Sequence, residues 1–147
     1  KEAGDWGVTP EVAAGMGVVR ELEVACEVMK DLKKRGVRVL PGGDYGFAWN
    51  PIGTNARDLE HFVNLFGYTP MEAIVAATKL GGQIMMMGDE LGTVREGWLA
   101  DLLLVDGDPS KDVSILQDAD KLLAIMKDGS FHKAPDAERL AQRIAAE

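Results

Sequence analysis

The sequence predicts an α/β fold that is followed by a smaller all-β segment. Between residues 10 and 66 the patterns run helix, strand, helix, which is the order within one unit of a parallel α/β fold. After Gly88 the apolar period changes from helical to strand-like. We therefore expect an α/β part over residues 1–88, a β part over 89–134 and a terminal helix over 135–147.

Two helices are predicted before the first strand. Thr9 and Pro10 begin the first, because a threonine hydroxyl can accept a backbone N–H and proline suits the first helical position. In the longer second helix, apolar residues recur at three- and four-residue spacing and so share one face. They are Val18, Leu22, Ala25, Met29 and Leu32. Gly36 is expected to end this helix, and Cys26, on or beside the apolar face, is expected in the core.

A short strand and two further helices are predicted next. Residues 37–40 are rich in β-branched side chains and stop at a Pro-Gly-Gly turn, which is typical of a strand that runs into a loop. After the loop, apolar residues between 59 and 66 define a helix that ends at Gly67. Residues 69–72 read Thr-Pro-Met-Glu, which combines a capping box with proline at the first helical position of the next helix.

The β part contains three recognisable pieces. Residues 102–105 are a continuous apolar run between aspartates, which suits a strand buried on both faces. Residues 122–126 form a second strand-like run. Asp128 and Gly129 follow it, and an Asp-Gly pair between two strand-like runs is a strong hairpin signal. Residues 136–147 are predicted to form a polar helix.

Composition limits the possible partners and the compartment of the protein. The net charge is −8, from 24 acidic and 16 basic residues, and no basic stripe is visible, so we expect neither nucleic acid nor an anionic membrane as partner. No apolar run approaches the ~18 residues of a membrane span. Cys26 is the single cysteine of the sequence, which excludes an intrachain disulfide and favours a reducing, cytoplasmic compartment.

Four segments in this order resemble the C-terminal end of the amidohydrolase superfamily, in its imidazolonepropionase and Xaa-Pro dipeptidase branch. Residues 36–44 resemble the last barrel strand and the aspartate that follows it. Residues 55–60 are similar to the next segment of that branch, and residues 69–78 to the helix after it. Residues 91–109 resemble its C-terminal β-domain signature.

The resemblance implies that the chain contains the last strand and flanking helices of a (β/α)8 barrel, followed by strands of a small β-sandwich domain. In the family, the aspartate at the position of Asp44 binds the metal and accepts a proton from the water that the metal activates. The implied reaction is hydrolysis of a C–N bond in a small molecule, such as an amide, a dipeptide or a cyclic amide. The implied cofactor is a divalent metal, and zinc is our expectation.

Most of the family's metal ligands have no counterpart in this sequence. They are a His-x-His pair, a carboxylated lysine or its equivalent, and two more histidines, whereas the chain has only His61 and His132, both expected on the surface. A barrel needs ~250 residues. We therefore expect this chain alone to bind no metal stoichiometrically. Its expected partner is the missing N-terminal portion of the barrel or another copy of the chain.

Two interpretations of the loop after residue 40 stay open. Gly-Gly-Asp-Tyr-Gly is good turn chemistry, but the neighbouring matches favour a metal-binding and catalytic role for Asp44. Tyr45, Phe47 and Trp49 alternate through the loop, where they either line a substrate pocket or pack the loop onto the barrel rim. The alternative to an enzyme is a non-catalytic folded remnant or an assembly module.

Overall fold

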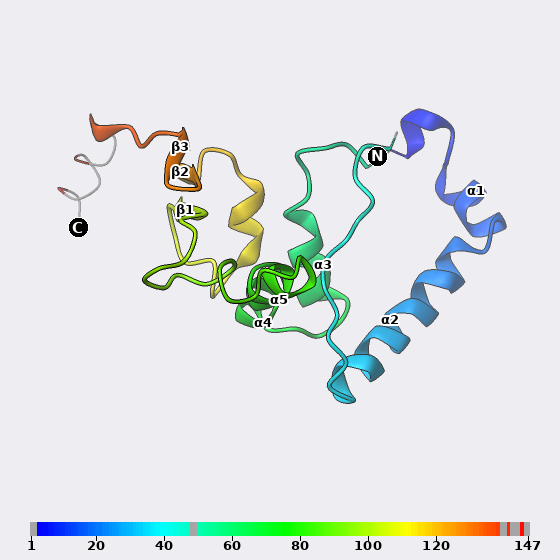
Figure 1. Cartoon of the computed structure of the whole chain (residues 1–147). Helices are drawn as coiled ribbons and strands as arrows, with labels where there is room; N and C mark the ends of the chain where they lie inside the picture. The colour runs from blue at the N-terminus through cyan, green and yellow to red at the C-terminus, as the bar shows by residue number, and fades with distance from the viewer. Residues whose placement is uncertain (1–2, 48–49, 139–140, 142–144, 146–147) are drawn as a thin grey trace.

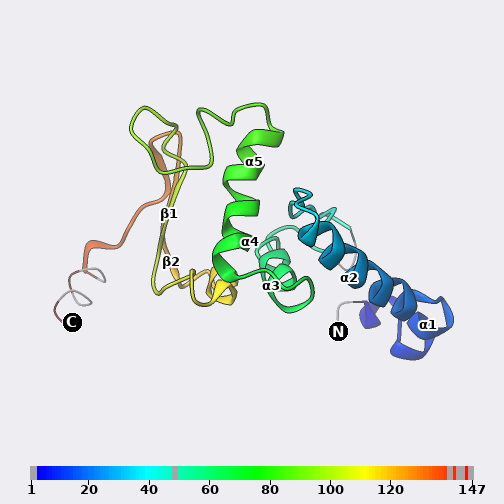
Figure 2. The same cartoon turned by 90° about the horizontal axis from the view of Figure 1, so that it is seen from below.

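The computed structural model of the 147-residue chain describes residues 3–47, 50–138, 141 and 145. The helices are α1 (Pro10–Gly15), α2 (Val18–Lys34), α3 (Arg57–Asn64), α4 (Pro70–Ala77) and α5 (Lys79–Ile84), with short 3-10 turns η1 (Gly4–Trp6) and η2 (Val113–Gln117). The strands are β1 (Leu102–Val105), β2 (Leu122–Lys127) and β3 (Ser130–Lys133). Figures 1 and 2 show α1 and α2 at one end of the molecule, the sheet at the other, and α3 to α5 between them.

The ends of the first two helices confirm the predicted signals. The hydroxyl of Thr9 accepts the backbone N–H of Val12 at 3.3 Å, and Pro10 is the first residue of α1. At the end of α2, Gly36 has a φ of 75°, a left-handed conformation that suits glycine. The N–H of Val37 then reaches back to the carbonyl of Leu32 at 3.0 Å, so α2 closes in a Schellman turn.

The apolar face of α2 is uncovered in the described part of the chain. None of the residues of α2 is buried, and Val18 and Leu22 on this face are 43% and 52% exposed. The expectation that Cys26 belongs to the core is therefore wrong, since its side chain is only half-buried. Among the described residues no element buries this face completely, although Met29 and Leu32 near its end are half-buried.

The predicted strand over residues 37–40 is also wrong as an element of a sheet. The segment belongs to no strand, although Val39 packs against the core. A strand is defined by the backbone hydrogen bonds that it exchanges with a neighbour. No strand of the described residues lies beside this segment, so its β-branched sequence has no ladder to join.

The core lies between α3, α4 and the η2 turn. The buried apolar residues that form it are Leu59, Phe62, Ala73, Ala76 and Val113. The Phe62 ring meets the rings of Phe66 and Tyr68 with centroids 5.3 Å and 5.0 Å apart. The predicted capping box at the start of α4 is confirmed, since Thr69 and Glu72 each accept the other's backbone N–H.

The C-terminal strands form an antiparallel sheet in the order β1-β2-β3. The hairpin signal between β2 and β3 is confirmed. Asp128 and Gly129 have φ values of 49° and 73°, the pair of positive values that a type I′ turn requires. The Asp101 carboxylate, just before β1, accepts the Asp128 N–H at 2.7 Å and so ties this turn to the first strand.

Burial of β1 on both faces is not observed. Leu102, Leu103 and Leu104 are 36%, 55% and 46% exposed, because their side chains point to the faces of the sheet and the described residues place no second layer over them. The described residues form one sheet, and a second layer of a sandwich stays a prediction.

The helix predicted over residues 136–147 lies largely outside the described residues. Within the described part of the chain, no helix combines the length and apolarity that a membrane span needs.

Candidate functional site

Asp44 lies four residues after Leu40, immediately before a turn. Pro41, Gly42 and Gly43 form no helix, since two successive glycines disfavour one, and the chain turns at residues 45 and 46. Asp44 itself has a φ of 50°, in the left-handed region that aspartate tolerates better than most residues. Its side chain is exposed to solvent.

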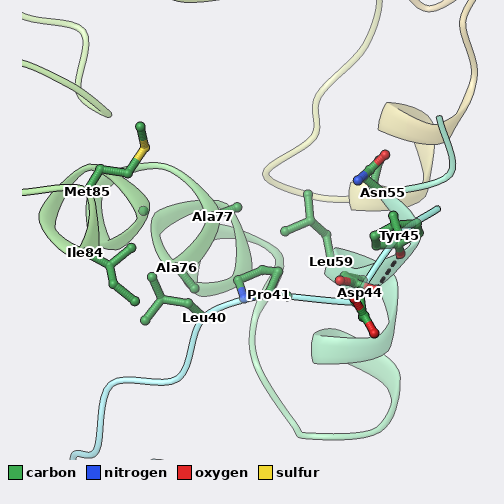
Figure 3. Close-up of a pocket in the computed structure, with 15 residues that line it drawn as sticks. Leu40, Pro41, Asp44, Tyr45, Asn55, Leu59, Ala76, Ala77, Ile84 and Met85 are labelled. Atoms are coloured by element: carbon green, nitrogen blue, oxygen red, sulfur yellow. Dashed lines mark hydrogen bonds between the residues drawn. The ribbon is translucent and has the colours of Figure 1, made fainter. Parts of the chain in front are cut away.

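A cleft of about 700 Å³ opens beside this turn (Figure 3). Its wall is apolar at one end and polar at the other. The apolar end is lined by Leu40, Pro41, Ala76, Ala77, Ile84 and Met85. The polar end is lined by Asp44, Tyr45 and Asn55. Asp58, which is hydrogen-bonded to Tyr45, also lines the cleft. A cleft of this size with a few convergent polar groups has the character of a small-molecule site.

Tyr45 is held against the first turn of α3. Its hydroxyl donates to Asp58 Oδ1 at 2.6 Å, and both side chains are half-buried. Partial burial, and then the hydrogen bond to Asp58, raise the pKa of Tyr45 above its usual 10. Gly43 makes this approach possible, because a Cβ there would overlap the Tyr45 ring and lie 2.9 Å from Asp58 Oδ2.

A second connection joins the same loop to the same helix. The Asn50 side-chain amide donates to the carbonyl of Gly43, and Arg57 Nη2 donates to Asn50 Oδ1 at 3.0 Å. Within the loop, the Gly46 N–H reaches the Asn50 carbonyl at 2.8 Å, and the Asn50 N–H reaches Phe47 at 2.9 Å. Gly43 and Tyr45, the two neighbours of Asp44, are thus both connected to the beginning of α3.

The structure brings together two of the four predicted site residues. Asp44 and Tyr45 both line the cleft. Phe47 is not among the lining residues and is 59% exposed. Trp49 lies outside the described residues. The roles assigned to these residues stay predictions.

Sequence reasoning missed Asn50, Arg57 and Asp58 as parts of this site. Arg57 and Asp58 lie within residues 55–60, which were matched as a segment without a role for any of its side chains. The sequence feature that could have indicated their role is the pair of adjacent opposite charges at the start of the predicted helix. Asn50 carried no signal of its own, since asparagine in a loop is ordinary turn chemistry.

The residues at the cleft fit one part of a metal site. A carboxylate such as that of Asp44 is a suitable ligand for zinc and other divalent cations, but a catalytic zinc takes three protein ligands. No group of three or more His, Cys, Asp or Glu side chains that could hold a metal occurs in the described residues. His61 and His132 are exposed on α3 and β3, as expected. The other ligands of such a site would have to come from outside the described residues.

Several known proteins are similar to this chain. Ochratoxinase from Aspergillus niger is 31% identical over 134 residues, which cover 82% of this chain and 26% of that protein. Imidazolonepropionase from Aeromonas hydrophila subsp. hydrophila is 29% identical over 98 residues, 67% of this chain and 24% of that protein. The crystal structure of a Xaa-Pro dipeptidase with bound methionine is similar with a TM-score of 0.66 and 28% identity, over 74% of this chain and 25% of that one.

The chain spans about a quarter of the length of the curated relatives that it matches. The crystal structure of A. niger ochratoxinase is similar with a TM-score of 0.69 and 27% identity, over 87% of this chain and 28% of that one. The sequence model of the Amidohydrolase family matches residues 8–131, which is most of the chain. The resemblance inferred from the sequence is therefore confirmed, and this chain belongs to the amidohydrolase family.

Proposed function

We propose that this chain forms the C-terminal part of a metal-dependent hydrolase that cleaves a C–N bond in a small molecule. The observation that carries the proposal is the position of Asp44 at the polar end of the cleft, four residues after Leu40. In barrel enzymes, catalytic side chains lie at the C-terminal ends of the strands. The family match over residues 8–131 supports a hydrolase rather than a non-catalytic module.

Asp44 is the catalytic carboxylate in this proposal. A divalent cation held there, zinc by our expectation, would lower the pKa of a water enough for attack near neutral pH. Asp44 would act as one ligand of the cation, accept the proton of the attacking water and pass it to the leaving nitrogen. The exposed carboxylate at the edge of the cleft leaves room for a substrate next to it.

The same proposal assigns places to the rest of the chain. In the complete barrel, residues 37–40 would lie beside strands that the described residues lack, with the α/β part over 1–88 around them. Residues 89–134 would contribute β1, β2 and β3 to a β-sandwich, and 135–147 would be its terminal helix. The open edge of β1 among the described strands supports this arrangement, because an exposed apolar edge strand is a template for pairing with a further strand.

The cleft favours a small amide with an apolar group. Its apolar end, which includes Leu40, Ile84 and Met85, would hold that group, and Tyr45 would contact the polar end of the substrate. Phe47 and Trp49 are proposed as further substrate contacts. The similar proteins named Xaa-Pro dipeptidase and imidazolonepropionase direct the search to dipeptides and cyclic amides.

The test is an assay of the complete protein that carries this chain, with three probes: a Xaa-Pro dipeptide, an N-acyl amino acid and a cyclic amide. We expect hydrolysis of at least one probe, its loss on chelation and its recovery when zinc is returned. A folded, metal-loaded protein that hydrolyses none of the three would contradict the proposal. The alternative of a folded remnant or assembly module would then be preferred.

A further inference from the structure

Asp44 lies between two residues that are each fixed to the same helix turn. Tyr45, on its C-terminal side, donates its hydroxyl hydrogen to Asp58 at 2.6 Å. Gly43, on its N-terminal side, accepts from the Asn50 amide, which is held in turn by Arg57 at 3.0 Å. A backbone position with both neighbours fixed has little freedom to move.

The support for these contacts is itself rigid. Arg57 and Asp58 immediately precede Leu59, whose side chain is only 8% exposed, and Phe62 on the next turn is 4% exposed. Both belong to the core cluster between α3 and α4. The first turn of α3 is therefore anchored by packing, and a site on a packed helix is more precise than one on a free loop.

These contacts stabilise an unfavourable backbone conformation at Asp44. Its φ of 50° is in a region that most residues avoid, and aspartate visits it mainly where the surroundings impose it. Gly43 lacks the side chain that would push the Tyr45 ring off Asp58. The same loop conformation is thus favoured by the left-handed backbone at Asp44, by the absence of a Cβ at Gly43 and by the two connections to α3.

We infer that Asp58 and Arg57 are positioning residues, which hold the loop on both sides of Asp44 through Tyr45 and Asn50 and so aim its carboxylate into the cleft. The inference rests on the proposed role of Asp44 and adds residues to it. Neither Asp58 nor Arg57 needs to contact the substrate. Both act through the direction that they give to the neighbouring carboxylate.

The principal test compares three variants of the complete protein. Asp58→Ala removes the acceptor for Tyr45, whereas Asp58→Asn keeps a carbonyl oxygen that can accept the same hydroxyl hydrogen. Glu60→Ala is the matched control, since Glu60 is an acidic residue on α3 whose contacts are Asn64 and Gln117. We expect Asp58→Ala to lower kcat about tenfold to a hundredfold with little change in KM, because partners behind a ligand have effects of this size. Asp58→Asn should recover most of that loss, and Glu60→Ala should resemble the wild type.

Two further readouts do not depend on turnover. Zinc affinity should fall with kcat in Asp58→Ala and recover in Asp58→Asn. In the metal-free protein, hydrogen exchange of the Gly46 and Asn50 amides should be faster in Asp58→Ala, because both donate within the loop that the contact holds. Arg57→Ala should have the same effects through Asn50. If Asp58→Ala fails to fold, Tyr45→Phe removes the same hydrogen bond and keeps the ring. Zinc affinity and amide exchange are then the readouts, because Tyr45 is itself a proposed substrate contact.

The outcomes separate this inference from the proposed function. Wild-type kcat, zinc affinity and amide exchange in Asp58→Ala, in a protein that Asp44→Asn inactivates, would overturn the positioning role and leave the proposed function standing. Failure of Asp58→Asn to recover any activity would also overturn it, because the charge of Asp58 and not its hydrogen bond would then matter. Full activity of Asp44→Asn would instead overturn the proposed function.

Discussion

The ammonium group of Lys33, in the last turn of α2, lies 2.9 Å from Glu72 Oε2 in the first turn of α4. Lys33 also donates to the Gly67 carbonyl at 2.7 Å and lies 4.5 Å from the centroid of the Tyr68 ring. The same Glu72 oxygen accepts the Thr69 N–H at 2.8 Å and completes the capping box. One carboxylate therefore begins a helix and holds the end of another helix against it.

The first prediction is a pH dependence of this contact. The Thr69 N–H, and then Lys33, lower the pKa of Glu72 from 4.5 to about 2. Because the folded pKa is depressed, the stabilisation is complete above 4.5 and is lost as the pH falls toward about 2. The side chain is 48% exposed, so we expect the effect to stay below about 1 kcal/mol.

Thermal unfolding of the wild type and of Glu72→Gln over this pH range measures the effect. The wild type should have the higher Tm near neutral pH, and the difference should shrink as the pH approaches 2, because other carboxylates contribute equally to both proteins. A difference in Tm that does not change with pH would contradict the assigned pKa. Lys33→Met should reduce the difference at neutral pH.

The second prediction concerns Gly92, which packs onto the junction of α4 and α5. Its φ is 87°, and a Cβ there would lie 2.7 Å from the Thr78 carbonyl carbon and 3.1 Å from Lys79 Cα. Gly97 has nearly the same φ, 82°, with nothing within 4 Å. Gly97→Ala should cost only the left-handed strain of about 1–2 kcal/mol. Gly92→Ala should cost about 1–3 kcal/mol more, because backbone must move to admit the methyl group.

Urea unfolding of the two alanine variants, with the wild type alongside, separates strain from overlap. The difference in unfolding free energy between the two variants is the cost of the overlap alone, because their backbone strain is nearly equal. Equal stabilities for Gly92→Ala and Gly97→Ala would show that the loop does not pack on the helix junction as described.

The third prediction concerns the uncovered edge of the sheet. Leu103 on β1 is 55% exposed, and burial of a leucine is worth ~1.5–3 kcal/mol. We expect the 147-residue chain by itself to self-associate or aggregate at micromolar concentration, and Leu103→Lys to shift it toward monomer, because a charge on an edge strand opposes further pairing. Val94→Lys is the control, since Val94 is 84% exposed but lies outside the sheet.

Sedimentation velocity of the wild-type chain and of both variants measures whether the chain self-associates through the β1 edge. If Leu103→Lys lowers the average mass of the sedimenting species and Val94→Lys does not, the β1 edge is supported as the contact between chains. A cooperative, well-folded monomer in all three proteins would show that the sheet needs no further strand.

Features that depend on neighbouring residues could be predicted from the sequence. The capping box at Thr69, the helix end at Gly36 and the turn at Asp128 and Gly129 each involve contacts within a few residues. Their residue types have the same physical preference in any fold. All three were confirmed.

Features that depend on distant residues could not be predicted in the same way. Residues 37–40 and the leucines of β1 have the composition of buried strands. Among the described residues, however, no strand lies beside residues 37–40 and no second layer covers the leucines of β1. The contact between Tyr45 and Asp58 joins residues 13 positions apart, and it also needs the absence of a side chain at Gly43. No pattern of apolar residues or turn chemistry encodes such a contact.

The most direct measurement of the central claim is the turnover of Asp44→Asn in the complete protein, with zinc content determined on the same sample. The amide is nearly isosteric with the carboxylate but cannot accept a proton, so the fold should be retained. Asp89→Asn is the control, since Asp89 is an exposed aspartate outside the cleft. We predict that kcat falls by about 10²–10⁴-fold in Asp44→Asn, the usual contribution of a general base, and stays unchanged in Asp89→Asn. Near-wild-type kcat in Asp44→Asn at full zinc occupancy would contradict the assignment of Asp44 as the catalytic carboxylate.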